Sequence, residues 1–266
     1  MTDLLCLENV SKAFGGLLAV NKVSMSIKEG QIFGLIGPNG AGKTTLFNTI
    51  TGLSPATEGK ILLNGENITG LSETKLVLHG ICRTFQKLKI FRGLTVLDNV
   101  MIGGHIQGKA SAMDALLQSK KTRAEENKLR EHAMYYIELL GLIDKKDQLA
   151  KNLSYGDQRR VEIARALAAE PTLLLLDEPA AGMNLSEARM LTELIVWIRD
   201  KLKKTILLIE HNMRVVMPIA DWVAVLSQGK KIADGTPYEV QKSEEVIIAY
   251  LGRSYVEMIK RRSKDA

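Results

Sequence analysis

Residues 37–45 read Gly37-Pro38-Asn39-Gly40-Ala41-Gly42-Lys43-Thr44-Thr45, and this stretch decides the fold. It matches the pattern GxxxxGK followed by serine or threonine, in which glycines let backbone N–H groups curl around an anion. An apolar run, Gln31 to Ile36, precedes it as a buried strand would, and a helix is expected from Lys43 to near Gly52. This order of strand, loop and helix predicts a phosphate-binding loop in an α/β protein.

The same loop predicts which side chains contact a nucleotide. Lys43 is expected to reach the β- and γ-phosphates of ATP, and the Thr44 hydroxyl is expected to ligate Mg²⁺. The helix N-terminus adds a partial positive charge. A glycine-rich turn without a ligand is the alternative, but a turn alone requires neither the lysine nor the threonine.

A second signal lies where four leucines, Leu173 to Leu176, lead into Asp177 and Glu178. The carboxyl end of such a strand is where open α/β sheets bind ligands. Asp177 is expected to bind Mg²⁺, and Glu178 to orient or deprotonate a water that attacks the γ-phosphate. An isolated Asp-Glu pair is more often the start of an exposed loop, so this interpretation depends on the phosphate loop.

The third segment is Leu153-Ser154-Tyr155-Gly156-Asp157-Gln158-Arg159-Arg160. Ser154 suits the N-cap of a helix that carries Val161, Ile163, Ala164 and Leu167, and capping is its simplest role. A helix end with a free hydroxyl and a glycine is also a second anion site. One chain would then hold two phosphate-binding helix ends.

Together the three segments resemble those of an ATP-binding cassette ATPase, and the resemblance extends from Leu7 to about Leu251. It implies a dimer in which Ser154, Gly156 and Gln158 of one subunit contact the ATP that the partner holds. Tyr155 departs from the glycine that is commonest there. Asn184, in the dimer loop Ala180–Asn184, stands where many relatives have aspartate and loses a charge.

The resemblance implies three further site residues. Phe14 resembles the aromatic residue that stacks on adenine, although a core phenylalanine is a serious alternative. Gln86, in Arg83-Thr84-Phe85-Gln86, resembles the glutamine that contacts Mg²⁺ and the attacking water. His211 resembles the histidine that contacts the γ-phosphate. The implied catalytic set is Lys43, Gln86, Glu178 and His211, and the implied metal ligands are Thr44, Gln86 and Asp177.

Within the superfamily the chain looks most like the LivG-type ATPase subunits of importers for branched-chain or hydrophobic amino acids. That resemblance implies a peripheral protein on the cytoplasmic face of the cell membrane, with transmembrane permease subunits as partners and a periplasmic or extracellular binding protein as an indirect one. It allows a homodimer or a heterodimer with a paralogous ATPase. Lipopolysaccharide-export ATPases are similar, and a soluble cassette ATPase acting on DNA or ribosomes is a further alternative. A non-catalytic nucleotide-gated module is disfavoured because Lys43 and Glu178 are both present.

Composition agrees with a folded protein of this size. The chain has 266 residues, 45% of them hydrophobic and 25% charged, and two cysteines, which argues against a disulfide scaffold. No apolar run approaches the ~18 residues that span a bilayer. Half of the net charge of +6 lies in residues 260–266. We interpret that basic tail as solvated rather than as a nucleic-acid site.

The pattern along the chain predicts an α/β P-loop fold with inserted and added parts. Leu4 to Val10 and Leu18 to Ile27 alternate as in an antiparallel sheet, with Gly15-Gly16 as the turn, and Ile61–Leu63 enters a tight turn at Asn64-Gly65. From about Ser72 the pattern turns helical, including a polar excursion from Gly103 to Arg130, and after Pro171 strands and helices alternate again to a last helix, Glu244 to Leu251. We expect one ATPase domain over 1–251, with core segments 1–87 and 160–235, a helical subdomain at about 88–159, and a basic tail over 252–266.

Overall fold

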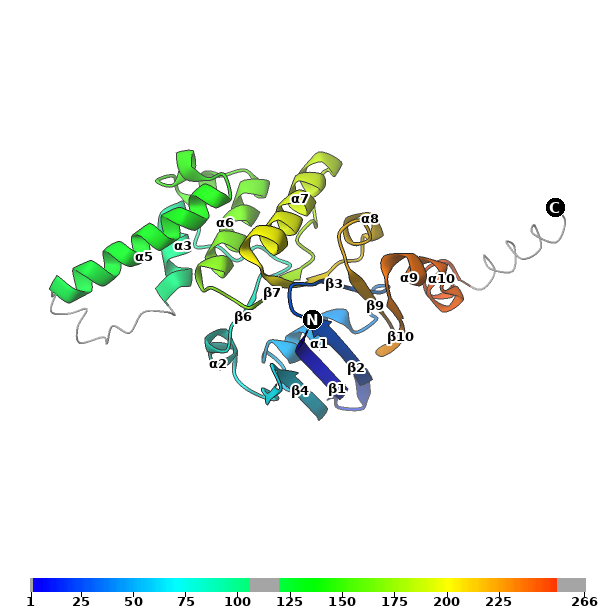
Figure 1. The fold of residues 1–266 in the computed structure, drawn as a ribbon. Coiled ribbons are helices and arrows are strands. Elements are labelled where there is room, and N and C mark those ends of the chain that lie inside the picture. The colour runs from blue at the N-terminus through cyan, green and yellow to red at the C-terminus, as the bar shows by residue number, and fades with distance from the viewer. Residues whose placement is uncertain (1, 106–119, 253–266) are drawn as a thin grey trace.

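The computed structural model describes residues 2–105 and 120–252 (Figure 1). Residues 106–119 of the predicted helical excursion, and residues 253–266 of the predicted basic tail, lie outside this part. Within it the expected α/β fold is confirmed, with a parallel-sheet core, an N-terminal antiparallel sheet and an inserted group of helices.

The N-terminal sheet is antiparallel and has the order β2-β1-β4-β5. The alternation of apolar and polar residues predicted its long strands, and Gly15 at the turn between β1 and β2 has a φ of 56°. Apolar side chains of β1, β2 and β4 lie in one core cluster. The bounds are β1 Asp3–Phe14, β2 Leu17–Lys28, β4 Glu58–Leu63 and β5 Glu66–Asn67.

The second sheet has the order β10-β9-β3-β8-β7-β6. Its five strands from β9 to β6 are parallel, and β10 pairs antiparallel with β9 at the edge. The expected strands at 31–36 and 173–176 are confirmed, and so is the return of strands after Pro171. The bounds are β3 Ile32–Ile36, β6 Ile81–Arg83, β7 Leu173–Asp177, β8 Thr205–Ile209, β9 Trp222–Ser227 and β10 Lys230–Gly235.

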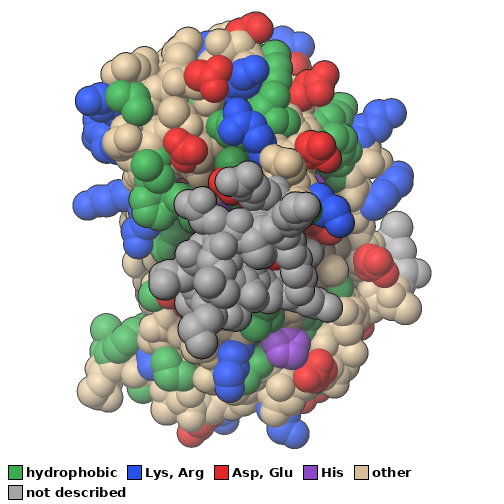
Figure 2. Space-filling model, turned by 90° about the vertical axis from the view of Figure 1, so that its left-hand side faces the viewer, with side chains coloured by type: hydrophobic (Ala, Val, Ile, Leu, Met, Phe, Trp, Pro, Cys, Tyr) green, Lys and Arg blue, Asp and Glu red, His purple; other side chains and the backbone are tan. Residues whose placement is uncertain are grey.

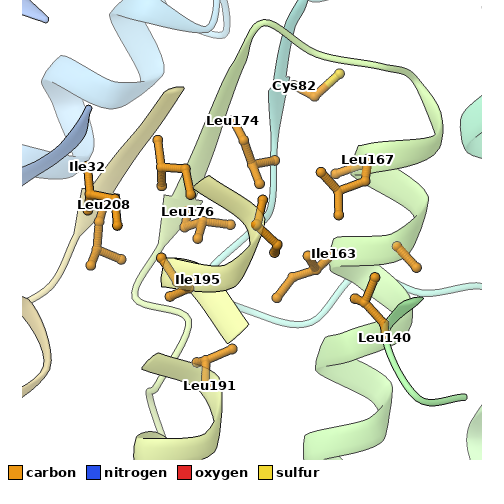
Figure 3. Close-up of a cluster of buried hydrophobic side chains, with 14 of the residues drawn as sticks. Ile32, Cys82, Leu140, Ile163, Leu167, Leu174, Leu176, Leu191, Ile195 and Leu208 are labelled. Carbon is orange, nitrogen blue, oxygen red and sulfur yellow. The ribbon is translucent and has the colours of Figure 1, made fainter. Parts of the chain in front are cut away.

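Both faces of this sheet are covered, which explains why its central strands are apolar without alternation. Leu174 and Leu176 of β7 point into the cluster shared with helices α6 and α7, as Figure 3 shows. Leu173 and Leu175 face the opposite cluster, which includes α1 and the antiparallel sheet. Helix α1, Lys43–Ile50, therefore lies between the two sheets and begins at the phosphate loop.

The inserted helices α3, α5 and α6 pack on one another and lie together at one end of the molecule in Figure 1. Thr95 caps α3 through a capping box with Asp98, and Ser154 caps α6, as its sequence predicted. The helices are α2 Glu73–Leu78, α3 Val96–Gly104, α5 Lys120–Leu139 and α6 Tyr155–Ala168, with short 3-10 turns at Ile143–Lys145 and Ala150–Asn152.

The prediction that the chain turns helical from about Ser72 was wrong at one place. Ile81–Arg83 forms strand β6, which pairs with β7 at the edge of the sheet. Ile81 and Cys82 are buried, and their burial against the neighbouring strand decides the conformation of a segment too short to show a period.

The remaining helices follow the returning strands. They are α7 Leu185–Leu202, α8 Met213–Val216, α9 Pro237–Lys242 and α10 Glu244–Leu251. Helices α9 and α10 lie at the end of the molecule opposite α5 (Figure 1). Across residues 2–105 and 120–252 no helix is long and apolar enough to cross a membrane.

Candidate nucleotide-binding site

The phosphate loop leaves the carboxyl end of β3 and closes tightly on the strands around it. Gly42 has a φ of 98°, and a Cβ there would lie 2.5 Å from the carbonyl oxygen of Ala19. Only glycine therefore fits the residue before α1. Lys43, the first residue of α1, is buried, and its Nζ donates hydrogen bonds to the carbonyl oxygens of Gly37 at 2.7 Å and Pro38 at 3.1 Å.

A cleft of about 560 Å³ lies over this loop. Gln86, Glu178 and His211 also line this cleft and come from three different connections of the parallel sheet. The structure thus brings all four predicted catalytic residues to one cleft. The full lining is Leu17, Ala19, Asn39, Gly40, Ala41, Gly42, Lys43, Thr44, Thr45, Gln86, Glu178 and His211.

Glu178 is held from several sides. Its Oε2 accepts a hydrogen bond of 2.8 Å from Nε2 of Gln86 and lies 3.4 Å from Nδ1 of His211. Its backbone N–H donates to Ile209 at 2.9 Å, and its carbonyl oxygen accepts from the N–H of Ala181 at 3.1 Å. The backbone has a φ of 43°, a left-handed conformation that costs about 1–2 kcal/mol for a residue with a side chain. These contacts hold the strained conformation, which aims the carboxylate at the cleft.

Asp177 lies deeper than Glu178. Its side chain is buried, and its Oδ2 is 3.6 Å from a terminal nitrogen of Arg83. Burial raises the pKa of Asp177, and the Arg83 guanidinium opposes that rise. Burial likewise lowers the pKa of Lys43, against the attraction of Glu178 and Asp177.

The predicted metal ligands suit Mg²⁺ by their chemistry. Thr44, Gln86 and Asp177 offer a hydroxyl, an amide carbonyl and a carboxylate, and hard oxygen donors are what this ion prefers. In the described part of the chain no three His, Cys, Asp or Glu side chains form a metal-binding group. That composition agrees with an ion held largely by phosphate oxygens and water rather than by a protein cage.

The segment that begins α6 lies apart from this cleft, since none of the residues 154–158 is in its lining. The Ser154 hydroxyl accepts from the backbone N–H of Asp157 at 3.2 Å, and Ser154 is exposed. A Cβ at Gly156 would meet nothing within 4 Å, so this helix end is open. Nε2 of Gln158 instead donates to the carbonyl oxygen of Leu153 at 3.0 Å.

Phe14 is 52% exposed at the end of β1, so the core alternative for this residue is wrong. Nζ of Lys12 lies 5.0 Å from the centre of its ring. Phe14 pairs with Leu17 at the β1–β2 turn, and Leu17 lines the cleft, whereas Phe14 is not among the lining residues. Its exposed ring is available to a flat ligand.

Two buried residues near this site, Glu210 and Arg159, were not predicted. Glu210 directly follows β8 and precedes His211, is buried, and accepts the backbone N–H of Ala180 at 3.0 Å. The signal was present, because an acidic residue follows a buried strand at the same sheet edge as Asp177. Arg159 is also buried, but in the sequence it looks like any arginine on an exposed helix face.

Comparison with known proteins agrees with this geometry. Residues 20–181, more than half of the chain, match the family described as ABC transporter, and residues 230–256 match the family described as branched-chain amino acid ATP-binding cassette transporter. The chain is 44% identical over 251 residues to the high-affinity branched-chain amino acid transport ATP-binding protein LivG of Salmonella typhimurium, covering 94% of this chain and 98% of that protein.

Two further relatives are similar over nearly the whole chain. BraF of Pseudomonas aeruginosa, a protein of the same description, is 41% identical, with 94% of this chain and 98% of the relative covered. The lipopolysaccharide export system ATP-binding protein LptB of Escherichia coli is 38% identical, with 93% and 97% covered. The amino-acid transport relatives are thus the more similar ones.

Solved structures share the fold. The ADP conformation of an ATP-binding cassette of an ABC transporter superposes with a TM-score of 0.83 at 34% identity, covering 95% of this chain and all of that one. A dimeric post-hydrolysis cassette bound to ADP and Pi has a TM-score of 0.73 at 25% identity, covering 88% and 99%. The fold is therefore found in both single and paired cassettes.

Proposed function

Since the chain belongs to the ABC transporter family of ATP-binding proteins and is an ATPase, we propose that it powers the import of branched-chain amino acids. The observation that carries the catalytic part is the meeting of Lys43, Gln86, Glu178 and His211 at one cleft over the phosphate loop.

Each of these side chains has a distinct role in the proposed reaction. Backbone N–H groups of residues 37–45 bind the phosphates, and Lys43 turns its ammonium group from the Gly37 and Pro38 carbonyls to the β- and γ-phosphates. Glu178 orients the attacking water and accepts its proton, while Gln86 fixes the carboxylate. His211 donates a hydrogen bond to the γ-phosphate from the far side of Glu178.

Mg²⁺, held by Thr44, Gln86 and Asp177, would neutralise charge on the phosphates during transfer. Arg83 holds the Asp177 carboxylate in place for that role. Phe14 is proposed to stack on the adenine, because its ring is exposed at the end of β1 and its strand partner Leu17 lines the cleft.

We propose a dimer because the open helix end at Ser154 and Gly156 serves no ligand within its own cleft. In the dimer these residues would close over the nucleotide held by the other subunit. Gln158 is proposed to act with them, and to do so it must give up its hydrogen bond to Leu153. We propose either a second copy of this chain or a paralogous ATPase as the partner, since either would present the same kind of helix end.

The proposed permease contact is a groove of about 750 Å³ that begins where the Gln86 loop ends. Phe85, Leu88 and Phe91 line it together with α2, α3 and α6. Figure 2 shows this end of the molecule, where hydrophobic side chains lie exposed among charged ones. A permease segment bound in this groove would contact the loop that carries Gln86. It would also hold the chain at the cytoplasmic face of the membrane.

The substrate proposal rests on the match at residues 230–256 and on the LivG and BraF relatives. The test is reconstitution with transmembrane permease subunits and a binding protein of a branched-chain amino-acid importer. ATP-driven uptake of labelled leucine, isoleucine or valine is expected. ATP-driven release of lipopolysaccharide without amino-acid uptake would support the export alternative instead.

Catalysis is tested on the purified chain and on the assembled transporter. Wild type is expected to hydrolyse ATP, and Glu178→Gln to lose about 100-fold or more in kcat while forming ATP-dependent dimers. Glu193→Gln is the matched control, because Glu193 is an exposed carboxylate on α7 that pairs with Arg189. An inactive wild type in both settings would exclude the enzymatic function.

A further inference from the structure

Tyr155 stands first in α6, next to the open helix end, where its hydroxyl joins two elements. It donates to the carbonyl oxygen of Ala181 at 3.1 Å, in the loop that follows Glu178. It accepts from a terminal nitrogen of Arg159 at 3.2 Å, one helical turn along α6. A glycine at this position would make neither contact.

From Ala181 one route leads directly to the backbone of the catalytic Glu178. The N–H of Ala181 donates to the carbonyl oxygen of Glu178 at 3.1 Å, across the left-handed backbone of that residue. The two polar groups of Ala181 therefore connect the Tyr155 hydroxyl with the backbone that aims Glu178.

A second route runs through the buried Arg159. Its guanidinium donates to the carbonyl oxygens of Phe85 at 2.8 Å and Gln86 at 3.1 Å, and it pairs with Glu162 at 2.7 Å. The side chain of Gln86 then donates to Glu178 at 2.8 Å. The second route therefore reaches the side-chain carboxylate of Glu178, whereas the first reaches its backbone.

The two routes close a hydrogen-bonded circuit of five residues, Tyr155, Ala181, Glu178, Gln86 and Arg159. We propose that Tyr155 is a positioning residue whose hydroxyl closes this circuit and holds the open end of α6 in fixed register with Glu178 of the same chain. The inference rests on the proposed function, in which the open end of α6 contacts the ATP held by the partner subunit. Glu178, in contrast, acts on the ATP held by its own chain. Contact with one nucleotide is thereby transmitted to hydrolysis of the other.

The test is the variant Tyr155→Phe, which removes the hydroxyl and keeps the ring. Its kcat for ATP is expected to fall about fivefold or more, because the hydroxyl's hydrogen bonds to Ala181 and from Arg159 are both lost, while the affinity of the monomer for ATP stays unchanged. Tyr135→Phe, also a half-exposed tyrosine but on α5, is the control and is expected to match wild type. Thermal unfolding of both variants is measured to show that the fold is retained.

A double-variant cycle with Gln86→Ala separates a circuit from two independent effects. Either substitution opens the same circuit, so the combined loss of kcat is expected to be well below the product of the single losses. If the two side chains acted independently, the two losses of kcat would multiply. A Tyr155→Phe enzyme within twofold of wild type, or multiplicative losses in the cycle, overturns the proposal.

These outcomes are distinct from a failure of the proposed function. An inactive wild type, or a Glu178→Gln variant that forms no ATP-dependent dimer, contradicts the function itself. An active wild type with an unaffected Tyr155→Phe variant contradicts only the circuit.

Discussion

Nε2 of Gln86 donates a hydrogen bond of 2.8 Å to Oε2 of Glu178, joining the loop after β6 to the residue after β7. Two residues far apart in sequence meet because β6 and β7 are adjacent parallel strands whose carboxyl ends share one edge of the sheet. The same loop continues into the groove beside α2 and α3. Gln86 thus lies between the catalytic carboxylate and the proposed permease contact.

Gln86→Ala is expected to lower kcat about tenfold with little change in the monomer's affinity for ATP. The reason is that the amide donates to Glu178, whereas the substitution leaves Lys43 and the rest of the phosphate loop unchanged. Steady-state hydrolysis and nucleotide titration measure the two quantities. Gln241→Ala, an exposed glutamine on α9, is the control. A large loss of ATP affinity would instead assign Gln86 to ground-state binding.

Glu210→Gln is expected to change how stability depends on pH. Burial raises the pKa of Glu210 above its ordinary value of 4.5, opposed by its hydrogen bond with Ala180. The folded protein then holds this proton more tightly than the unfolded chain, so stability decreases as pH rises from about 4.5 through the raised pKa. Glutamine removes that slope and keeps an acceptor for Ala180.

Denaturant unfolding of wild type and Glu210→Gln between about pH 4 and pH 7 checks this sign. The stability of wild type relative to the variant should decline as pH rises. Glu193→Gln controls for the loss of one negative charge at an exposed position. The raised pKa would be contradicted if the free energy of unfolding of wild type increased relative to that of Glu210→Gln as pH rises.

The core of the site was predictable because its chemistry is local in sequence. Lys43 follows a glycine loop, Asp177 and Glu178 end an apolar strand, and Ser154 precedes a helix; each pattern carries its own physical reason. The strand-loop-helix order then placed Lys43, Asp177 and Glu178 at the carboxyl ends of the parallel strands, whereas Ser154 lies apart from the cleft. Gln86 and His211 depended on family resemblance, since a lone glutamine or histidine has no such pattern.

The other contacts around the site could not be predicted, because they depend on tertiary packing that no local pattern encodes. Arg159 and Glu162 are one helical turn apart, a spacing typical of an exposed pair, yet both are buried. Their burial arises because the loop from Phe85 to Lys89 folds over them, with Glu162 accepting both of those backbone N–H groups. The contact of Tyr155 with Ala181 likewise joins segments that only the fold brings together.

Arg159→Met is expected to destabilise the chain by about 3–5 kcal/mol, because it leaves the buried Glu162 carboxylate without its partner. The double variant Arg159→Met with Glu162→Gln should recover part of the loss, since no uncompensated charge remains. Chemical denaturation measures both free energies of unfolding. Equal destabilisation by the single and double variants would show that packing, rather than charge, dominates at this site.

Asp177→Asn is expected to raise the Mg²⁺ concentration for half-maximal hydrolysis about tenfold or more, because it removes the only charged residue among the proposed ligands. Binding of ATP in EDTA should change little, since the phosphate loop is untouched. Asp200→Asn, an exposed aspartate on α7, is the control. An unchanged Mg²⁺ requirement would remove Asp177 from the proposed ligand set.

Phe91→Ser is expected to reduce transport at least tenfold while leaving dimerisation and hydrolysis by the isolated chain within about twofold of wild type. Phe91 is 48% exposed and lines the groove. Its backbone is fixed independently of the ring, because the buried Asn99 accepts its N–H at 2.8 Å and donates to its carbonyl at 3.0 Å. The substitution therefore changes the groove surface without moving the loop.

The control for the groove is Tyr238→Ser, an exposed aromatic residue on α9 at the opposite end of the molecule (Figure 1). Co-purification with the permease subunits and uptake by the assembled transporter are measured for both variants. The groove is the permease contact if only Phe91→Ser loses co-purification, because the two substitutions remove similar exposed apolar area from different faces. Normal assembly and uptake with Phe91→Ser would place the permease elsewhere on this chain.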